Sequence, residues 1–140
     1  MTDEQLGIVE MPSSTRKFAV GNDLVLLSEF ELSFNKLFEA KIYTGNEIKY
    51  CTSFSNSMLR FAATWAAKEA VYKAVKQIDA RPLSLKKIEI KRNEIGGIPI
   101  VVLHSHFDSS YSISLSITHD GAYAWAVAIV EIDKEQVRIH

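Results

Sequence analysis

The stretch AATWAAKEAVYKAV, residues 62–75, decides how this chain folds. Its alanines recur every four residues, which places them along one side of a helix. The members of this alanine stripe are Ala62, Ala66, Ala70 and Ala74, widened by Ala63 and Ala67. Because small side chains let another backbone approach closely, the pattern predicts a buried helix over about 57–77, ended by the sequence DARP.

Three charged residues, Lys68, Glu69 and Lys73, lie in the middle of this apolar helix. Burying a charge is costly unless the charge is paired or bound to an ion. Glu69 and Lys73 are four residues apart with the acid first, the favourable order for a helix ion pair. They therefore form either an exposed pair, worth about 0.3–0.5 kcal/mol, or part of a functional site.

The rest of the chain predicts one strand, then helices, then two β-hairpins. The segment FAVGNDLVLL (18–27) is apolar and β-branched, as strands are. Ser28 and Glu31 have the spacing of a capping box that opens a helix running to Ala40, and a short helix is expected within 43–51. The four hairpin strands are expected at 83–93, 98–105, 112–118 and 122–132. This order predicts an α+β fold, with an antiparallel sheet wrapped around one long helix.

The composition is that of an ordinary globular protein, with 140 residues, 47% hydrophobic and 24% charged. We expect a single domain over 17–140, preceded by an extension over 1–16. A net charge of −1 gives no indication of nucleic acid or anionic membrane as a partner. No apolar run approaches the roughly 20 residues that span a bilayer. The first residues lack the basic start and apolar block of a secretory signal, which predicts a cytoplasmic location.

Several other side chains have an ordinary structural interpretation beside a functional one. Cys51 is the only cysteine, which excludes a disulfide within the chain and favours a partly buried thiol over a nucleophile. His104 and His106 have the spacing of metal ligands on a strand, but without a third ligand nearby in the sequence we expect an ordinary strand-end pair. Trp65 and Trp125 are expected to be core or subunit-contact aromatics.

Asp23 stands in a strand that Gly21 interrupts, where a solvated acid is unexpected. One interpretation is that Asp23 forms a turn. The other is that it meets Glu69 where the first strand packs on the long helix. Two carboxylates held together repel unless a cation lies between them, and Mg²⁺ takes one or two carboxylates plus substrate phosphates. With Lys68 and Lys73 on either side, the set predicts phosphoryl transfer.

Four blocks of the sequence carry a resemblance to a known family. They are GND followed by LVLL, then KIYTGNEIKYC, WAAKEAVYKA and SLSITHDGAYAWAVAIV. In this order they resemble the blocks of the holo-[acyl-carrier-protein] synthase family, the small 4′-phosphopantetheinyl transferases. The resemblance runs from about Phe18 to Ile132 and implies the fold of those enzymes.

The resemblance implies a reaction and a role for five residues. Such enzymes move 4′-phosphopantetheine from coenzyme A to a serine of an acyl carrier protein and release adenosine 3′,5′-bisphosphate. By resemblance, Asp23 and Glu69 hold Mg²⁺ on the pyrophosphate, and Lys73 neutralises the charge on the transferred phosphate. Lys68 resembles a second phosphate contact, and His119 resembles the histidine of the nucleotide pocket. The base that activates the serine is either a metal-bound water or Glu69.

The family is usually trimeric with sites between subunits, so the resemblance implies a homotrimer. The alanine stripe and the strand SISLSIT are then expected to serve assembly as well as the core. The chain departs from the family at Asn22, at Leu26 and at Thr64, which replaces an arginine. Arg60, one helical turn earlier, is expected to replace that coenzyme contact. Glycines that usually follow the long helix in the family are absent from KAVKQIDARP.

The first helix has the opposite charge from the one that the family presents to its acidic carrier. It carries Glu29, Glu31 and Glu39 against Lys36, with Lys41 just beyond. Because charge complementarity sets encounter and specificity, we expect an atypical carrier or docking through other basic residues. Those residues are Arg60, Lys86, Lys87, Lys91 and Arg92.

Two alternatives to an enzyme remain open at this point. One is a non-catalytic oligomer on the same fold that binds coenzyme or carrier without turnover, which Thr64 and the missing glycines favour. The other is a structural oligomer without a ligand. The combination of Asp23, Glu69, Lys73 and His119 favours the enzyme.

Overall fold

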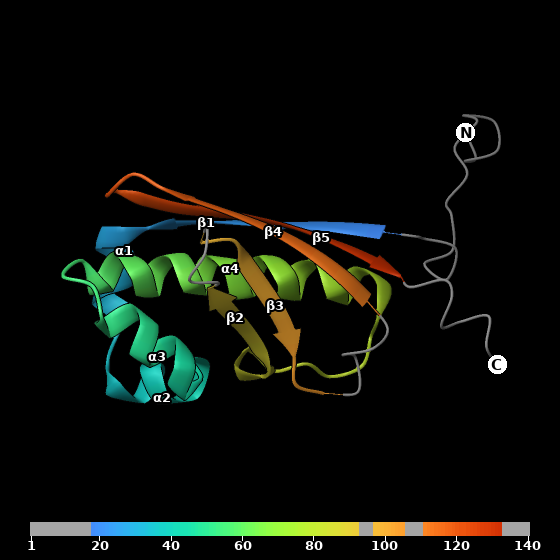
Figure 1. The fold of residues 1–140 in the computed structure, drawn as a ribbon, viewed down its shortest axis with the longest axis horizontal. Coiled ribbons are helices and arrows are strands. Elements are labelled where there is room, and N and C mark those ends of the chain that lie inside the picture. The colour runs from blue at the N-terminus through green and yellow to red at the C-terminus, as the bar shows by residue number, and fades with distance from the viewer. Residues whose placement is uncertain (1–17, 93–96, 106–110, 133–140) are drawn as a thin grey trace, which may run out of the picture.

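The long helix α4 (Ser57–Ile78) is the centre of the molecule, and the strands and short helices pack around it (Figure 1). The computed structural model describes residues 18–92, 97–105 and 111–132. Three antiparallel strands cover one face of the helix, in the spatial order β1 (Phe18–Leu26), β5 (Tyr123–Ile132) and β4 (Tyr111–His119). The predicted helix and the predicted α+β class are therefore confirmed.

A second sheet contacts the same helix. It contains β2 (Ile88–Arg92) and β3 (Pro99–Leu103), paired antiparallel and preceded by the short 3-10 helix η2 (Leu85–Lys87). The helix α4 contacts β2, and β3 contacts β4. Both predicted hairpins are present, but the described strands form two separate sheets rather than a single continuous one.

Three short helices fill the segment between β1 and α4: α1 (Leu27–Ser33), α2 (Lys36–Ile42) and α3 (Gly45–Thr52). The prediction of one helix from Ser28 to Ala40 is wrong, because Asn35 starts a new helix by accepting a 2.8 Å hydrogen bond from the backbone N–H of Phe38. Ser28 caps nothing, since Leu26 precedes α1.

The capping box lies later, between Thr44 and Glu47 at the start of α3. Phe30, Phe34 and Phe38 follow one another at the four-residue spacing of a helix, and they meet across the break, with ring centroids 5.7–6.0 Å apart. The aromatic cluster rather than a continuous helix explains that pattern.

The alanine stripe of α4 is buried within this chain. Ala62, Ala66, Ala70 and Ala74 all have 0% exposure. Small residues also face the helix from the sheet, where Ala124, Ala126 and Ala128 of β5 are completely buried. Small side chains on both surfaces let the backbones approach closely. The expectation that the stripe also serves assembly is therefore wrong, because the chain's own sheet covers it.

The backbones of β1 and α4 approach each other closely at Gly21. A Cβ at this position would lie 2.0 Å from the carbonyl oxygen of Ala70 and 2.7 Å from the backbone nitrogen of Ala74. No side chain fits there without moving backbone. The glycine that weakens the strand pattern is therefore the residue that lets the strand lie directly on the helix.

Two predictions fall outside the described residues: the extension 1–16 and the position of His106. Within the described ranges, no helix is long and apolar enough to cross a membrane.

Candidate functional site

The close approach at Gly21 brings Asp23 of β1 to the side of α4. The Asp23 Oδ1 atom lies 2.8 Å from Nζ of Lys73, which also donates a 3.2 Å hydrogen bond to the carbonyl oxygen of Asn22. The Lys73 side chain is 50% exposed and the Asp23 side chain 16% exposed. The ion pair therefore lies at the surface, where an incoming anion has access to the ammonium group.

Glu69 lies one helical turn before Lys73, and Asp23 affects its titration as well. Burial, and then repulsion from Asp23, raises the pKa of the Glu69 carboxyl, while Lys73 lowers it. In the described part of the chain, no group donates a hydrogen bond to the Glu69 carboxylate. The structure thus brings together Asp23, Glu69 and Lys73, the residues that the sequence analysis placed at one site.

The donor set of this site fits Mg²⁺. Two carboxylates separated by 46 positions in the sequence are close enough to repel one another, and that of Glu69 accepts no hydrogen bond among the described residues. Those residues contain no group of three or more His, Cys, Asp and Glu side chains suited to a metal. A metal held mainly by protein ligands has no site there, whereas Mg²⁺ takes only one or two carboxylates and completes its shell with phosphates and water.

Lys68 does not belong to this site, and the prediction that it contacts a phosphate conflicts with the structure. Its side chain has 0% exposure, and Nζ lies 2.6 Å from Oε1 of Glu47. The ammonium group also donates to the carbonyl oxygen of Ile88 in β2. Burial lowers the pKa of Lys68, and Glu47 raises it. The charge that the sequence left unexplained is thus neutralised inside the protein.

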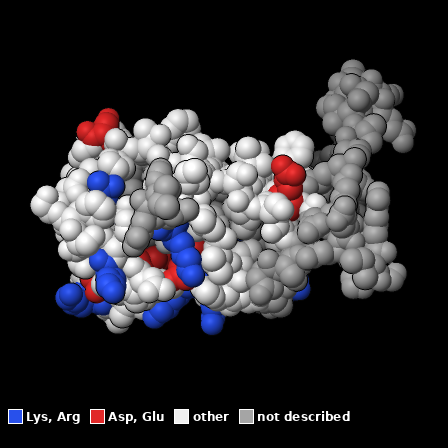
Figure 2. All heavy atoms as spheres, in the orientation of Figure 1, with Lys and Arg blue, Asp and Glu red and all other residues white. Residues whose placement is uncertain are grey.

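A second, basic cluster consists of His119 at the end of β4, Arg60 of α4 and Arg92 of β2. Burial, and then the charges of Arg60 and Arg92, lower the pKa of His119. The Arg60 guanidinium lies 4.1 Å from the ring centroid of Phe54, which holds it by a cation–π contact. Figure 2 shows basic side chains gathered toward the end of the molecule where α2 and α3 lie.

The structure does not bring His119 and Asp23 side by side. Asp23 pairs with Ala126 of β5, and Ala126 pairs on its other side with Ile117 of β4. Two strand spacings, about 9.5 Å, therefore separate Asp23 from Ile117, and His119 lies two residues further along β4. Within one chain, the acidic site and the basic cluster are separate.

Thr64 and Cys51 belong to the core. Both are buried, and their side-chain oxygen and sulfur are 3.6 Å apart. Burial raises the pKa of the Cys51 thiol to about 11, so this cysteine is not poised as a nucleophile. Because position 64 faces the interior, the expectation that Thr64 leaves a coenzyme contact missing loses its basis.

His104 has a structural partner. Its Nε2 atom lies 2.9 Å from Oε1 of the buried Glu89, and Glu89 also accepts a 2.6 Å hydrogen bond from the hydroxyl of Thr44. The expected strand-end interpretation therefore holds for His104.

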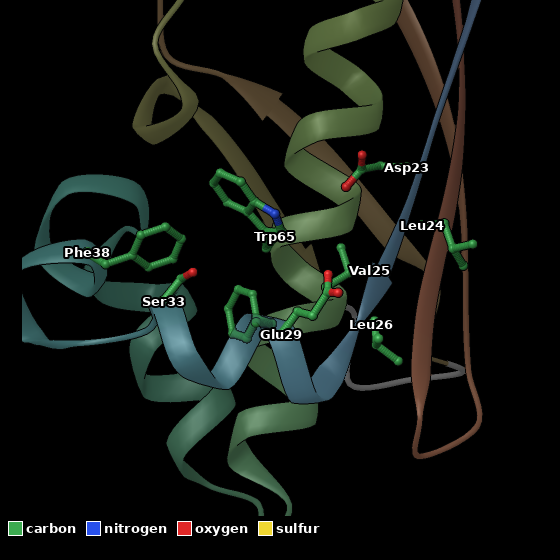
Figure 3. A pocket seen from close by; sticks show the side chains of 9 residues that line it. Asp23, Leu24, Val25, Leu26, Glu29, Ser33, Phe38 and Trp65 are labelled. Carbon is green, nitrogen blue, oxygen red and sulfur yellow. The ribbon is translucent and has the colours of Figure 1, made fainter.

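A pocket of about 350 Å³ opens beside Asp23, and sequence reasoning missed it. Its wall includes Glu29 and Ser33 of α1, Phe38 of α2 and Trp65 of α4 (Figure 3). Trp65 packs on Phe38 at 5.1 Å between ring centroids, so its assignment as a core aromatic is only part of its role. The available signal was the spacing of Trp65 four residues before Glu69, which places both on one side of the helix.

Comparison with known proteins gives a family and two kinds of relative. The sequence model of the 4′-phosphopantetheinyl transferase superfamily matches residues 19–128. Holo-[acyl-carrier-protein] synthase of Fusobacterium nucleatum is 33% identical over 119 residues, covering 79% of this chain and 96% of that protein. The enzyme of the same description from Chlamydia trachomatis is 37% identical over 120 residues, covering 81% and 99%.

Fungal relatives are much longer than this chain. Fatty acid synthase subunit alpha of Candida albicans is 37% identical over 119 residues, which cover 80% of this chain. The matched segment spans only 6% of that subunit.

Solved structures share the fold. The ACPS–CoA complex of Chronobacterium ammoniagenes superposes with a TM-score of 0.71 at 26% identity, covering 84% of this chain and 99% of that chain. A holo-(acyl-carrier-protein) synthase from Bacillus anthracis, in complex with CoA (3′,5′-ADP), also has a TM-score of 0.71 and 26% identity, with 84% and 100% covered.

Proposed function

This chain belongs to the 4′-phosphopantetheinyl transferase superfamily, and we propose that it transfers 4′-phosphopantetheine from coenzyme A to a serine of an acyl carrier protein. The observation that carries the proposal is the meeting of Asp23, Glu69 and Lys73 at an accessible edge of α4. Two carboxylates and a lysine are what a Mg²⁺-dependent phosphoryl transfer needs at its phosphates.

In this proposal Asp23 and Glu69 hold Mg²⁺, which neutralises the pyrophosphate and polarises the phosphorus–oxygen bonds when it is bound. Lys73 contacts the transferred phosphate. Its position 2.8 Å from Asp23 keeps the ammonium group beside the phosphates, and its half-exposed stem leaves room for it to turn toward them.

The bond changes follow from the substrates. The serine oxygen of the carrier forms a bond to the phosphorus that bears pantetheine. The bond from that phosphorus to the bridging oxygen breaks, and its electron pair leaves with adenosine 3′,5′-bisphosphate. The hydroxyl proton passes to a base. The Glu69 carboxylate accepts no hydrogen bond among the described residues, so one of its oxygens can take the proton while the other would hold Mg²⁺.

We assign the nucleotide end of coenzyme A to His119 and Arg60, joined by Arg92. These three residues form the basic cluster and suit the phosphate of the nucleotide. Since about two strand spacings separate that cluster from Asp23 in one chain, the site is complete only if a second copy supplies one of the two halves.

We therefore also propose a homo-oligomer, as a homotrimer with its sites between subunits. The outer face of the three-stranded sheet supports this, because it exposes large apolar side chains that a monomer leaves in water. They are Phe18, Val20, Leu24, Tyr123, Trp125 and Ile129. Sedimentation of the full chain tests the proposal, and Ile129→Glu should shift it toward monomers while lowering transferase activity. A monomeric wild type with full activity contradicts it.

The carrier is proposed to be atypical for the family. Glu29 and Glu31 on α1 are exposed and not neutralised by an ion pair among the described residues, so this helix repels an acidic partner. The basic surface toward α2 and α3 is the alternative docking surface (Figure 2). An ordinary rate on a standard acidic carrier would contradict the atypical choice and leave the transferase assignment intact.

The decisive experiment is mass spectrometry of candidate carrier proteins after incubation with the full chain, coenzyme A and Mg²⁺. We expect a carrier to gain the mass of 4′-phosphopantetheine, and the gain should disappear with Glu69→Gln. The non-catalytic alternative predicts binding without that gain. Thermal unfolding separates the third possibility, since a structural oligomer gains no stability from coenzyme A with Mg²⁺. The predicted cytoplasmic location stays a prediction that cell fractionation tests.

A further inference from the structure

Strand β1 lies at the edge of the three-stranded sheet, next to β5. On its outer side, the backbone carbonyls of an edge strand bond to water or to groups outside the sheet. Two side chains of α4 are such groups. The amide of Gln77 donates a 2.7 Å hydrogen bond to the carbonyl oxygen of Val20, and the ammonium group of Lys73 donates a 3.2 Å hydrogen bond to that of Asn22. We call these two hydrogen bonds the edge contacts.

The spacing of the edge contacts matches on the two elements. Lys73 and Gln77 are one helical turn apart, about 5.4 Å along α4. Val20 and Asn22 are two residues apart, about 6.7 Å along β1, so their carbonyls point to the same edge. Between them lies Gly21, which lets the strand lie directly on the helix. The edge contacts therefore fix the position of β1 along the axis of α4.

The edge contacts differ in charge. The ammonium group of Lys73 also lies 2.8 Å from the carboxylate of Asp23, which points toward α4 (Figure 3). In the proposed function this ammonium group turns toward a phosphate, and its contact with the carbonyl of Asn22 is then lost. Gln77 is neutral, so a phosphate attracts its amide much less strongly. Of the two edge contacts, that of Gln77 is therefore the one that persists while the coenzyme is bound.

We propose that Gln77 is a positioning residue of the proposed metal site. When Lys73 turns toward the phosphate, the hydrogen bond from Gln77 to Val20 keeps β1 against α4. Asp23 follows Val20 by three residues on the same strand, so its carboxylate stays close to that of Glu69. The inference rests on the proposed transferase function, which assigns Mg²⁺ to these two carboxylates. Gln77 acts through the strand, without touching the metal or the coenzyme.

Hydrogen exchange of the full chain without ligand tests the contact itself. Gln77→Met removes the amide but keeps the length of the side chain and a high helix propensity. We expect the β1 backbone to exchange faster in the double variant Lys73→Met/Gln77→Met than the product of the two single effects, by about threefold or more, because both edge contacts are then absent. If the two single effects simply multiply, the contacts do not replace one another and the proposal is wrong.

Calorimetry tests the consequence for the metal site. The measured quantity is the ratio of the coenzyme A affinities with and without Mg²⁺. We expect Gln77→Met to lower this ratio by about twofold to tenfold, the contribution of one hydrogen bond, with the affinity in the absence of Mg²⁺ unchanged. Unfolding curves confirm that the variant retains the fold.

Lys76→Met is the matched control for the calorimetry. It introduces the same side chain at the preceding residue of α4. The ammonium group of Lys76 donates to the carbonyl oxygens of Ala80 and Arg81, just beyond the end of α4, and not to β1. The ratio of affinities in Lys76→Met should therefore equal that of the wild type.

The outcomes separate this inference from the one it rests on. A wild type whose affinity for coenzyme A does not depend on Mg²⁺ overturns the proposed metal site, and the role of Gln77 falls with it. If the wild type shows that dependence and Gln77→Met behaves like Lys76→Met, only the role of Gln77 is wrong. It is also wrong if Gln77→Met weakens coenzyme A equally with and without Mg²⁺, because a purely structural change has that effect.

Discussion

Lys68 and Glu69 are neighbours in the sequence, yet they belong to opposite regions of the molecule. Lys68 is enclosed between α3, α4 and β2, where Glu47 and a backbone carbonyl satisfy its ammonium group. Glu69 is only partly buried, beside Asp23, and has no hydrogen-bond donor among the described residues. One charge is paired by the fold, and the other is not; in the proposed function Mg²⁺ pairs it.

The difference teaches how a helix supports a site. Successive residues of an α-helix point about 100° apart, so one can be anchored inside while the next faces a ligand. Glu47 also accepts a 2.8 Å hydrogen bond from the backbone of Ile90 and caps α3. The buried pair therefore connects α4 to α3 and β2. This connection fixes the rotation of α4 about its own axis, and with it the side of the helix that Glu69 and Lys73 present to β1.

The largest expected effect comes from breaking the interior pair. Lys68→Met leaves Glu47 as a buried charge without its partner, which should lower the free energy of unfolding by about 3–5 kcal/mol. Denaturant unfolding measures this. The double variant Lys68→Met/Glu47→Gln should recover part of the loss, because the charge is gone. A stable Lys68→Met protein with weakened coenzyme A binding would instead restore the phosphate-contact role.

Glu69→Gln tests the other half of the comparison. We expect a loss of about 10²–10³-fold in kcat, since a group acting on transition-state charge is removed, with little change in unfolding. Steady-state kinetics on a modified carrier measures it. Glu31→Gln, which removes an exposed acid on α1, is the matched control and should keep kcat, because a charge on this helix affects the encounter with the carrier rather than the chemical step. Full activity of Glu69→Gln would rule out its assigned role.

Gly21→Ala links the two regions, because it acts on packing and on the site together. The new Cβ would meet backbone at 2.0 Å, so β1 must move away from α4. We expect a loss of about 1–3 kcal/mol in stability and weaker Mg²⁺-dependent binding as Asp23 moves with the strand. Gly45→Ala has nothing within 4 Å of its Cβ and provides the control. Unchanged Mg²⁺ dependence in a destabilised Gly21→Ala would show that the close approach does not position Asp23.

The smallest effect concerns pH and the basic cluster. Burial, Arg60 and Arg92 lower the pKa of His119, and Asp120 raises it, so the free histidine is mostly neutral near pH 7. A bound phosphate favours the protonated form, which raises that pKa. Affinity for coenzyme A should therefore increase as pH falls toward 6, by up to about tenfold per pH unit for one proton. Calorimetry at several pH values checks this, and His119→Asn should remove the dependence.

Much of the fold was predictable from periodicity. The spacing of alanines gave α4 nearly to its ends, and alternation in 83–93 and 112–118, with a turn after each, gave both hairpins. The break between α1 and α2 was not predictable from the phenylalanine spacing, because the same side chains cluster whether or not the helix continues. The division into two sheets depends on pairing between distant strands, which a local pattern does not specify.

The site was predictable only in part. The sequence suggested a shared role for Asp23, Glu69 and Lys73. In the structure Lys73 pairs with Asp23, and both affect the pKa of Glu69. The role of Lys68 was wrong because its partner Glu47 lies 21 positions away, in a different helix. The pocket beside Asp23 was missed because its wall comes from four elements.

By itself the sequence determined which segments form helices and strands, and which charged residues lack an ordinary explanation. Both are local properties, set by side-chain size, spacing and the cost of burying charge. Only the tertiary structure decided which lysine is buried and which acids are close enough to repel one another. Those outcomes depend on how closely β1 lies on α4, and Gly21 permits that contact only once the two elements pack.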